Sequence, residues 1–126
     1  MPASPVPSLV PSFTLPAPVA PGLAPLQAGV EAVRRWDTHD LAQYARILHQ
    51  IAVMKYNTMG MIPLDRNVFV ATSELYFQAF PDVHTEILRS IEFKDGWVLN
   101  EVVWRGTNTG PYFGIPATGK PVSLRG

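Results

Sequence analysis

The chain has 126 residues, 47% of them hydrophobic and 16% charged, and its 10 basic residues balance its 10 acidic ones. This length fits one domain, and a net charge of zero argues against binding of nucleic acids, which needs clustered Lys and Arg. The absence of cysteine excludes disulfides, thiolate metal sites and cysteine nucleophiles. No stretch of about 18 apolar residues is free of proline and charge, so we expect no membrane span and a cytoplasmic protein.

The first 25 residues form an uncharged arm that is rich in proline, and 8 of the 13 prolines lie in it. Proline removes backbone donors and fixes φ, so the arm is neither a helix nor a central strand. It also lacks the basic start and the unbroken apolar run of a secretory signal. Two interpretations remain open. The arm is disordered or forms polyproline II, or its apolar residues lie on a surface of its own domain or of a partner.

Residues 26–80 carry the three- and four-residue apolar spacing that is typical of helices. We expect three helices, over residues 26–36, 39–50 and 65–80. The third ends before Pro81, because the residue that precedes a proline avoids the helical region. A short strand is expected between the second and third helices, over residues 51–59.

After Pro81 the apolar period changes from 3.6 to 2, which predicts strands over residues 83–94, 96–106 and 120–125. A turn that contains Gly96 joins the first two. One face of the first strand is expected to carry Val83, Thr85, Ile87, Arg89 and Ile91. One face of the second should carry Val98, Asn100, Val102 and Trp104, and the other Trp97, Leu99, Glu101, Val103 and Arg105. Neither face of the second strand is fully polar, so we expect both to be covered. Helices followed by meandering strands predict an α+β fold, with helices on one face of an antiparallel sheet.

Three landmarks, in the right order along the chain, point to a known family. Residues 104–110 (WRGTNTG) and 114–120 (GIPATGK) resemble the W-x-G-T-H-T-G and G-x-P-P-T-G-K segments of SnoaL-like proteins, the polyketide-cyclase and ester-cyclase branch of the NTF2-like superfamily. Residues 79–82 (AFPD) resemble another segment of that family, and residues 38–41 (THDL) resemble the start of its second helix. The resemblance implies a SnoaL-like domain over residues 26–126, in which a curved sheet rolls around helices into a cone with an apolar pocket.

The chain departs from the family pattern in three places. Asn108 replaces a histidine, and an amide cannot exchange protons near neutral pH. Glu101 is the last acidic residue, so a carboxylate on a later strand, which the family's cyclases use, is absent. Family members also continue into further strands, so we expect a cone without its last strands, whose open edge needs a cover.

The resemblance and the residues together nominate a site. Glu101 is the candidate catalytic residue, since burial in a pocket would raise its pKa and make it a general base. The alternative for Glu101 is an ion pair with Arg105 or Arg89 on a sheet surface. The candidate ligand-binding residues are Trp104, Asn108, Tyr112 and Tyr76. For Asn108 the alternative is a loop held by hydrogen bonds between side chain and backbone, and for Trp104 it is a place in the core.

Two functions from different classes remain open, and whether the chain is an enzyme is undecided. The first is a cyclase or isomerase that acts on a small, largely apolar carbonyl compound. The second is a non-catalytic NTF2-like scaffold or accessory subunit that docks to a partner through its proline-rich arm. The spacing of histidines and acidic residues supports no metal site, and no cofactor is expected. We expect either a homodimer across the sheet face that bears Trp97, Leu99 and Val103, or a place in a larger protein assembly.

Overall fold

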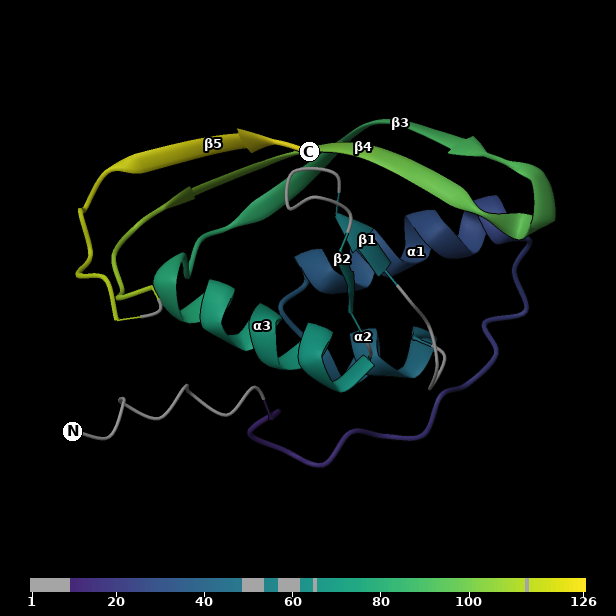
Figure 1. Cartoon of the computed structure of the whole chain (residues 1–126), viewed down its shortest axis with the longest axis horizontal. Coiled ribbons are helices and arrows are strands. Elements are labelled where there is room, and N and C mark those ends of the chain that lie inside the picture. Colours follow the sequence, from purple (N-terminus) through teal and green to yellow (C-terminus); the bar gives the residue numbers. More distant parts are fainter. Residues whose placement is uncertain (1–9, 49–53, 57–61, 65, 113) are drawn as a thin grey trace.

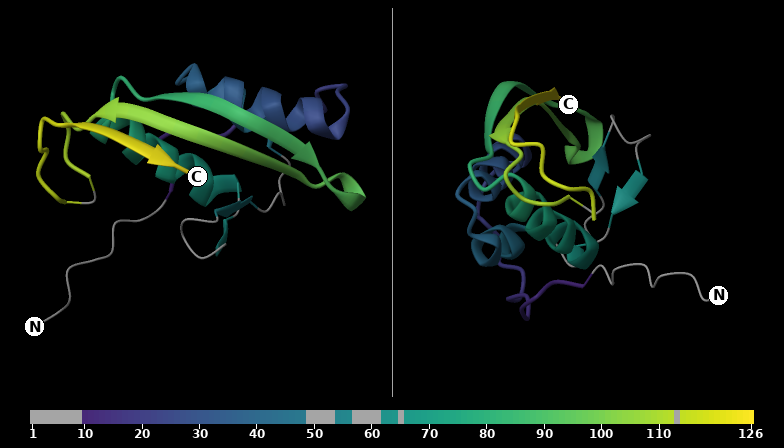
Figure 2. Two further views of the ribbon diagram at one scale, coloured as in Figure 1. Left: turned by 90° about the horizontal axis from the view of Figure 1, so that it is seen from above. Right: turned by 90° about the vertical axis from the view of Figure 1, so that its left-hand side faces the viewer.

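The computed structural model describes residues 10–48, 54–56, 62–64, 66–112 and 114–126 (Figure 1). Its helices are α1 (Pro25–Asp37), α2 (Leu41–Ile47) and α3 (Arg66–Ala79). Its strands are β1 (Met54–Tyr56), β2 (Ile62–Leu64), β3 (His84–Glu92), β4 (Val98–Thr107) and β5 (Pro121–Arg125). The predicted α+β fold is confirmed, with helices on one side of an antiparallel sheet (Figures 1 and 2). Among the described helices, none is long and apolar enough to cross a membrane.

The main sheet has the strand order β3-β4-β5, and β1 pairs with β2 in a separate ribbon. The turn between β3 and β4, over Lys94–Gly96, uses left-handed backbone at Asp95 (φ 64°) and Gly96 (φ 77°). This geometry explains why the predicted turn contains a glycine. β5 pairs only with the second half of β4, from Val103 to Thr107. The predicted strand over residues 51–59 is described only at β1, and its remaining residues lie outside the described ranges.

The expected single face on β3 is wrong, because the pairing register shifts between Ile87 and Arg89. Ile87 pairs with the buried Val102, and Arg89 pairs with Glu101. Two positions along β3 therefore correspond to only one position along β4. A bulge adds one residue to one strand, and side chains alternate along a strand, so the two residues point to opposite sides. The alternation in the sequence has no signal for this insertion.

One face of the sheet is covered by α1, and the opposite face is open in the single chain. A Cβ added at Gly29 of α1 would lie 2.7 Å from Cγ1 of Val98, so glycine allows the helix to approach β4 closely. On the other face, 44% of Leu99 and 51% of Trp97 is exposed. The expectation that both faces of β4 are covered is therefore wrong for the chain by itself.

The core lies between α2 and α3. Phe69 and Val70 of α3 pack against the buried apolar residues of the second helix and its C-cap, which are Leu41, Tyr44, Ala45 and Leu48. The predicted bounds of this helix are wrong at both ends. His39 has a φ of 64°, which no helix accepts, and Leu48 has an extended backbone (φ −82°, ψ 123°). The helix therefore begins after Asp40 and ends at Ile47.

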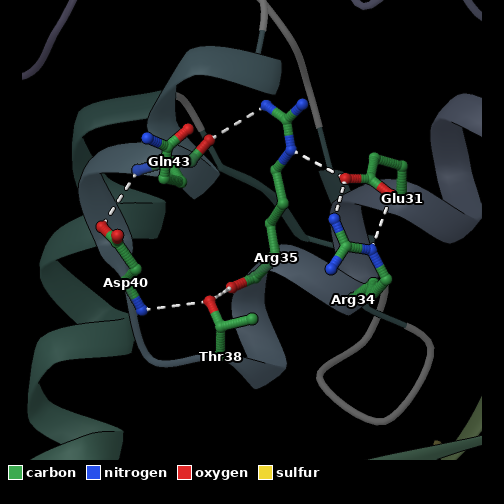
Figure 3. A network of polar contacts seen from close by, with 6 residues as sticks. All are labelled: Glu31, Arg34, Arg35, Thr38, Asp40 and Gln43. Carbon is green, nitrogen blue, oxygen red and sulfur yellow. Dashed lines mark hydrogen bonds and ion pairs between the residues drawn. The ribbon is translucent and has the colours of Figure 1, made fainter.

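Polar contacts hold the corner between α1 and α2 (Figure 3). Asp40 caps α2, because its carboxylate accepts from the backbone N–H of Gln43 at 3.2 Å. Arg35 links the two helices, since its Nε donates to Glu31 at 3.0 Å and its Nη1 donates to the carbonyl of Gln43 at 3.2 Å. Hydrogen bonds from Arg34 and Arg35 lower the pKa of Glu31 to about 2. The corner is thus tied by charge as well as by the cap.

The described part of the arm, residues 10–24, lies along α2 and α3 of its own domain (Figure 1). The backbone N–H of Val19 donates to the carbonyl of Arg46 at 2.8 Å, and the buried guanidinium of Arg66 donates to the carbonyls of Pro16 and Ala45. Phe13 and Leu15 of the arm pack on the core. For these residues the surface-bound interpretation holds, and the surface belongs to the same chain. Docking of the arm to a partner stays a prediction.

Candidate functional site

Three of the four segments that carry the family resemblance, residues 79–82, 104–110 and 114–120, meet where α3 ends. The carbonyl of Ala79, the last residue of α3, accepts from the backbone N–H of Thr109 at 3.1 Å and of Gly110 at 3.2 Å. It also accepts from Nδ2 of Asn108 at 3.4 Å. The last carbonyls of a helix have no partner within the helix, so this loop caps α3. A Cβ on Gly110 would lie 2.0 Å from the carbonyl oxygen of Gln78, so only glycine fits here.

Asn108 is 8% exposed, and its amide is fully engaged in the loop. Besides Ala79, its Nδ2 donates to the carbonyl of Gly110 at 3.0 Å. Its Oδ1 accepts from the backbone N–H of Thr118 at 2.9 Å and from the hydroxyl of Thr118 at 3.2 Å. A carboxamide offers two N–H donors and two lone pairs, and all four are used here. The geometry therefore favours the interpretation in which Asn108 holds the loop.

Asp82 ties the end of β4 to the segment after α3. One of its carboxylate oxygens accepts from the backbone N–H of Thr107 at 2.7 Å, and the other accepts from the Thr107 hydroxyl at 2.8 Å. These two hydrogen bonds, the backbone one first, hold the pKa of the Asp82 carboxyl below its usual range. We call the contacts of Asp82, Asn108 and Gly110 with Thr107, Thr118 and Ala79 the loop clamp.

Two predicted ligand-binding residues, Tyr76 of α3 and Tyr112 of the loop, lie against each other. Their ring centroids are 5.3 Å apart, and Phe80 lies 6.2 Å from Tyr112 and 6.3 Å from Tyr76. Burial raises the pKa of the Tyr112 phenol, and a hydrogen bond with Tyr76 adds to the effect. Both rings are half-buried. Tyr112 is therefore a protonated donor across the ordinary pH range, and we call these three rings the aromatic cluster.

Trp104 and Glu101 lie on opposite faces of β4, because their positions differ by an odd number, three, and side chains alternate along a strand. Half-buried Trp104 shares the covered face with Val102 and pairs with Thr85 of β3 and Leu124 of β5. Glu101 lies on the open face. At roughly 3.3 Å per strand residue, its backbone is about 20 Å from that of Thr107. The structure thus separates Glu101 from the loop that holds Asn108 and Tyr112.

Two arginines bind Glu101. One carboxylate oxygen accepts from Nε of Arg89 at 2.9 Å, and the other accepts from Nε of Arg125 at 3.0 Å. These partners, Arg125 first, lower the pKa of Glu101 rather than raising it. The structure therefore shows the ion pair with Arg89 that we weighed as the alternative, whereas Arg105 binds Glu86 at 2.7 Å. A general-base role for Glu101 stays a prediction, and its two cations weaken it as a base.

Two hollows lie near these elements. One, of about 450 Å³, lies where β3 begins and β4 ends, and it is lined by Asp82, His84, Arg105, Gly106, Thr107, Pro121, Val122 and Ser123. The other, of about 380 Å³, lies between α1 and the turn before β4. Neither is lined by a predicted site residue. Among the described residues, no group of three His, Cys, Asp or Glu side chains is placed to hold a metal ion.

A family model described as SnoaL-like polyketide cyclase matches residues 29–126. The chain belongs to the SnoaL-like polyketide cyclase family. The comparison with curated proteins gives no match.

Solved structures show the same NTF2-like fold. AclR from Streptomyces galilaeus, a candidate hydroxylase, aligns with a TM-score of 0.67 at 22% identity, over 80% of this chain and 62% of that one. IdmH from Streptomyces antibioticus, a candidate polyketide cyclase, aligns with a TM-score of 0.64 at 23% identity, over 82% of this chain and 78% of that one. A candidate SnoaL-like polyketide cyclase from Jannaschia sp. CCS1 aligns with a TM-score of 0.59 at 18% identity, over 84% of this chain and 78% of that one. This SnoaL-like chain thus spans less than two thirds of the AclR chain.

Sequence reasoning on this SnoaL-like chain missed the partners of its signature residues. The AFPD segment gave no role to Asp82 by itself, and Thr107 and Thr118 were not singled out. The family signature held a signal, because it repeats threonine and glycine on both legs of one loop. Contacts between segments about 10 to 30 residues apart nevertheless need the fold before they can be assigned.

Proposed function

We propose that this SnoaL-like domain binds a small, largely apolar carbonyl compound at the aromatic cluster, as a cyclase or an isomerase does. Membership of the polyketide-cyclase family supports the substrate class. The observation that carries the proposal is the half-buried phenol of Tyr112, which lies against the rings of Tyr76 and Phe80. The rings offer apolar area to a flat ligand, and the hydroxyls offer a polar end.

The chemistry that suits this cluster is stabilisation of an enolate. In an aldol ring closure or a carbonyl isomerisation, a proton leaves the carbon beside the carbonyl, and negative charge develops on the carbonyl oxygen. A phenol that donates to that oxygen stabilises the charge, and it does so most where water is excluded. Tyr112 donates this hydrogen bond when its single O–H turns from Tyr76 to the carbonyl oxygen. The departing proton needs an acceptor, and the predicted base, Glu101, lies on the open face with Arg89 and Arg125. A base role for Glu101 therefore requires that water carries the proton to its carboxylate.

Binding of a fluorescent hydroxyanthraquinone, a flat and largely apolar aromatic ketone, tests this proposal. Tyr112→Phe removes the donor and keeps the ring, so we expect the affinity to fall about five- to tenfold, as loss of one hydrogen bond does. Tyr44→Phe, in the core away from the cluster, is the matched control and should bind normally. Equal affinity of the Tyr112→Phe variant and the unchanged protein would contradict the proposed site.

Glu101→Gln tests the general-base role separately. If Glu101 is the base, this variant folds and binds the ketone but loses turnover. Turnover that survives the substitution would remove Glu101 from the mechanism and leave the phenol in place.

We also propose that the open face of the sheet binds a second copy of the chain. Leu99 and Trp97 are exposed there, and Val103 lies on the same face between Glu86 and Arg125. Apolar side chains ringed by paired charges suit a two-fold interface, in which each copy presents the same patch. Leu99→Arg should turn a dimer into a monomer in light scattering at micromolar concentration. A monomer before the substitution would contradict this proposal.

A further inference from the structure

The loop between Gly110 and Thr118 leaves the end of α3 and returns to it, and the amide of Asn108 joins its two legs. Nδ2 donates to the carbonyl of Gly110 on the outgoing leg, at 3.0 Å. Oδ1 accepts from the backbone and the hydroxyl of Thr118 on the returning leg, at 2.9 and 3.2 Å. The same amide reaches the carbonyl of Ala79 on the helix. One side chain therefore crosslinks both legs and fastens them to α3.

Tyr112 lies two residues beyond the crosslinked Gly110, and its position depends on that neck. Between the legs, the ring of Tyr112 packs against Tyr76 and Phe80, and the backbone closes a local turn. The backbone N–H of Tyr112 donates to the carbonyl of Ile115, and the reverse bond closes the turn, both at 2.9 Å. Residues 114–118 are exposed, and nothing lies within 4 Å of a Cβ built on Gly114. The described part of the tip is thus joined to the end of α3 through the neck and through the ring of Tyr112.

We propose that Asn108 is a positioning residue, whose carboxamide sets where the Tyr112 phenol lies against Tyr76. It is not a ligand contact, because all four of its hydrogen-bonding positions are used and the side chain is buried. The amide suits this task, since it offers two donors and an acceptor with two lone pairs in one plane. A histidine, the family's residue at this position, offers only one donor and one acceptor when neutral. This inference rests on the proposed function in one respect, namely that Tyr112 donates a hydrogen bond to the ligand.

The state of Tyr112 is measurable without any ligand, by titrating tyrosinate absorbance of the full chain with base. A tyrosine in water ionises near pH 10, whereas burial and the bond with Tyr76 raise the pKa of Tyr112. In Asn108→Ala we expect one additional tyrosine to ionise near its ordinary pH. In the double variant Asn108→Ala with Tyr112→Phe that additional tyrosine should be absent. A titration unchanged in folded Asn108→Ala, or the same gain in the double variant, would overturn the proposal.

Two further variants test whether the effect is specific to Asn108 and whether it persists in a milder substitution. Asn100→Ala removes the same type of side chain from β4, where Nδ2 donates to Gly29 at 3.2 Å, and it should leave the tyrosine titration unchanged. Thr118→Val removes one bond to Asn108 and keeps the backbone bond, so it carries the test if Asn108→Ala does not fold. We expect Thr118→Val to give a smaller shift in the same direction, and no shift in a folded Thr118→Val would overturn the proposal.

Ketone binding then separates this inference from the proposed function. If both hold, Asn108→Ala weakens hydroxyanthraquinone binding as much as Tyr112→Phe does, and the double variant weakens it no further, because residues that act as one unit are not additive. If Tyr112→Phe binds normally while Asn108→Ala still releases a tyrosine, the proposed function fails and the positioning role stands. An additive loss in the double variant would contradict the route through Tyr112.

Discussion

The loop clamp at the end of β4 and the ion pairs on its open face use polar groups in opposite ways. In the clamp, the Asn108 amide and the Asp82 carboxylate bind uncharged donors and acceptors, Asn108 is buried, and Gly110 fits the backbone of α3 without space for a methyl group. On the open face, Glu101 lies between two arginines that are both largely exposed to water.

The two regions differ in how firmly their polar contacts hold the backbone. Buried hydrogen bonds are costly to leave unmade, so they hold a backbone in one place. Exposed ion pairs are screened and adaptable, and most contribute little to stability. For this reason we propose the ligand site beside the clamp and not on the open face.

The largest effect is expected from Gly110→Ala. The new methyl group would lie 2.0 Å from the carbonyl oxygen of Gln78, which is backbone and cannot move aside. We expect the free energy of unfolding in urea to fall by about 3 kcal/mol, at the upper end for overpacking. Gly114→Ala is the matched control in the same loop, with open space and φ 78°. It should cost only about 1 kcal/mol of left-handed backbone strain, and equal losses would contradict a tight contact at Gly110.

The second largest loss of stability is expected from Asn108→Ala. It removes the hydrogen-bonding partner of the Gly110 carbonyl and of the N–H and hydroxyl of Thr118. We therefore expect the free energy of unfolding to fall by about 2 kcal/mol. Asn100→Ala, which breaks bonds to Gly29 and Ser90, should cost about 1 kcal/mol, because that side chain is less buried. The reverse order would show that the clamp is not the tighter of the two regions.

Acid and salt separate the two carboxylates. The folded-state pKa values of Asp82 and Glu101 are both lowered, so each stabilises the fold above its ordinary pKa and loses that contribution as pH falls through the folded value. Asp82→Asn and Glu101→Gln should therefore both flatten the acid side of a plot of stability against pH. The partners of Glu101 are cations that salt screens, whereas Asp82 binds an N–H and an O–H. Added salt should erase the difference between Glu101→Gln and the unchanged chain, and leave that of Asp82→Asn.

The smallest effect is expected for ketone binding in Glu101→Gln. The carboxylate lies on the face of β4 opposite to Trp104 and about 20 Å along the strand from Thr107, so the affinity for the hydroxyanthraquinone should not change. Titration of the fluorescent ketone against both proteins measures this. A clear loss of affinity would place Glu101 within reach of the ligand and reverse our comparison of the two regions.

Local patterns in the sequence sufficed for the order and the type of most elements. The helical spacing after Leu26, the stop at Pro81 and the turn at Gly96 are read from neighbouring residues, and α1, α3 and β4 match them within two residues. The family signature likewise indicated the fold, which the family match and the solved structures confirm. β2 was not predicted, because its three residues are too few to show a period.

The site depended on contacts between segments that are distant in sequence. Alternation along β4 showed that Glu101 and Trp104 face opposite ways, but which face the helices cover follows from the fit of Gly29 on Val98. The partners of Glu101 depend on register, because Arg125 lies 24 residues away and the bulge after Ile87 moves Arg89 to its side. The four bonds of Asn108 likewise exist only once α3 and both legs of the loop meet. Periodicity is a property of neighbours along the chain, whereas hydrogen bonding and pKa depend on neighbours in space, and packing alone decides those.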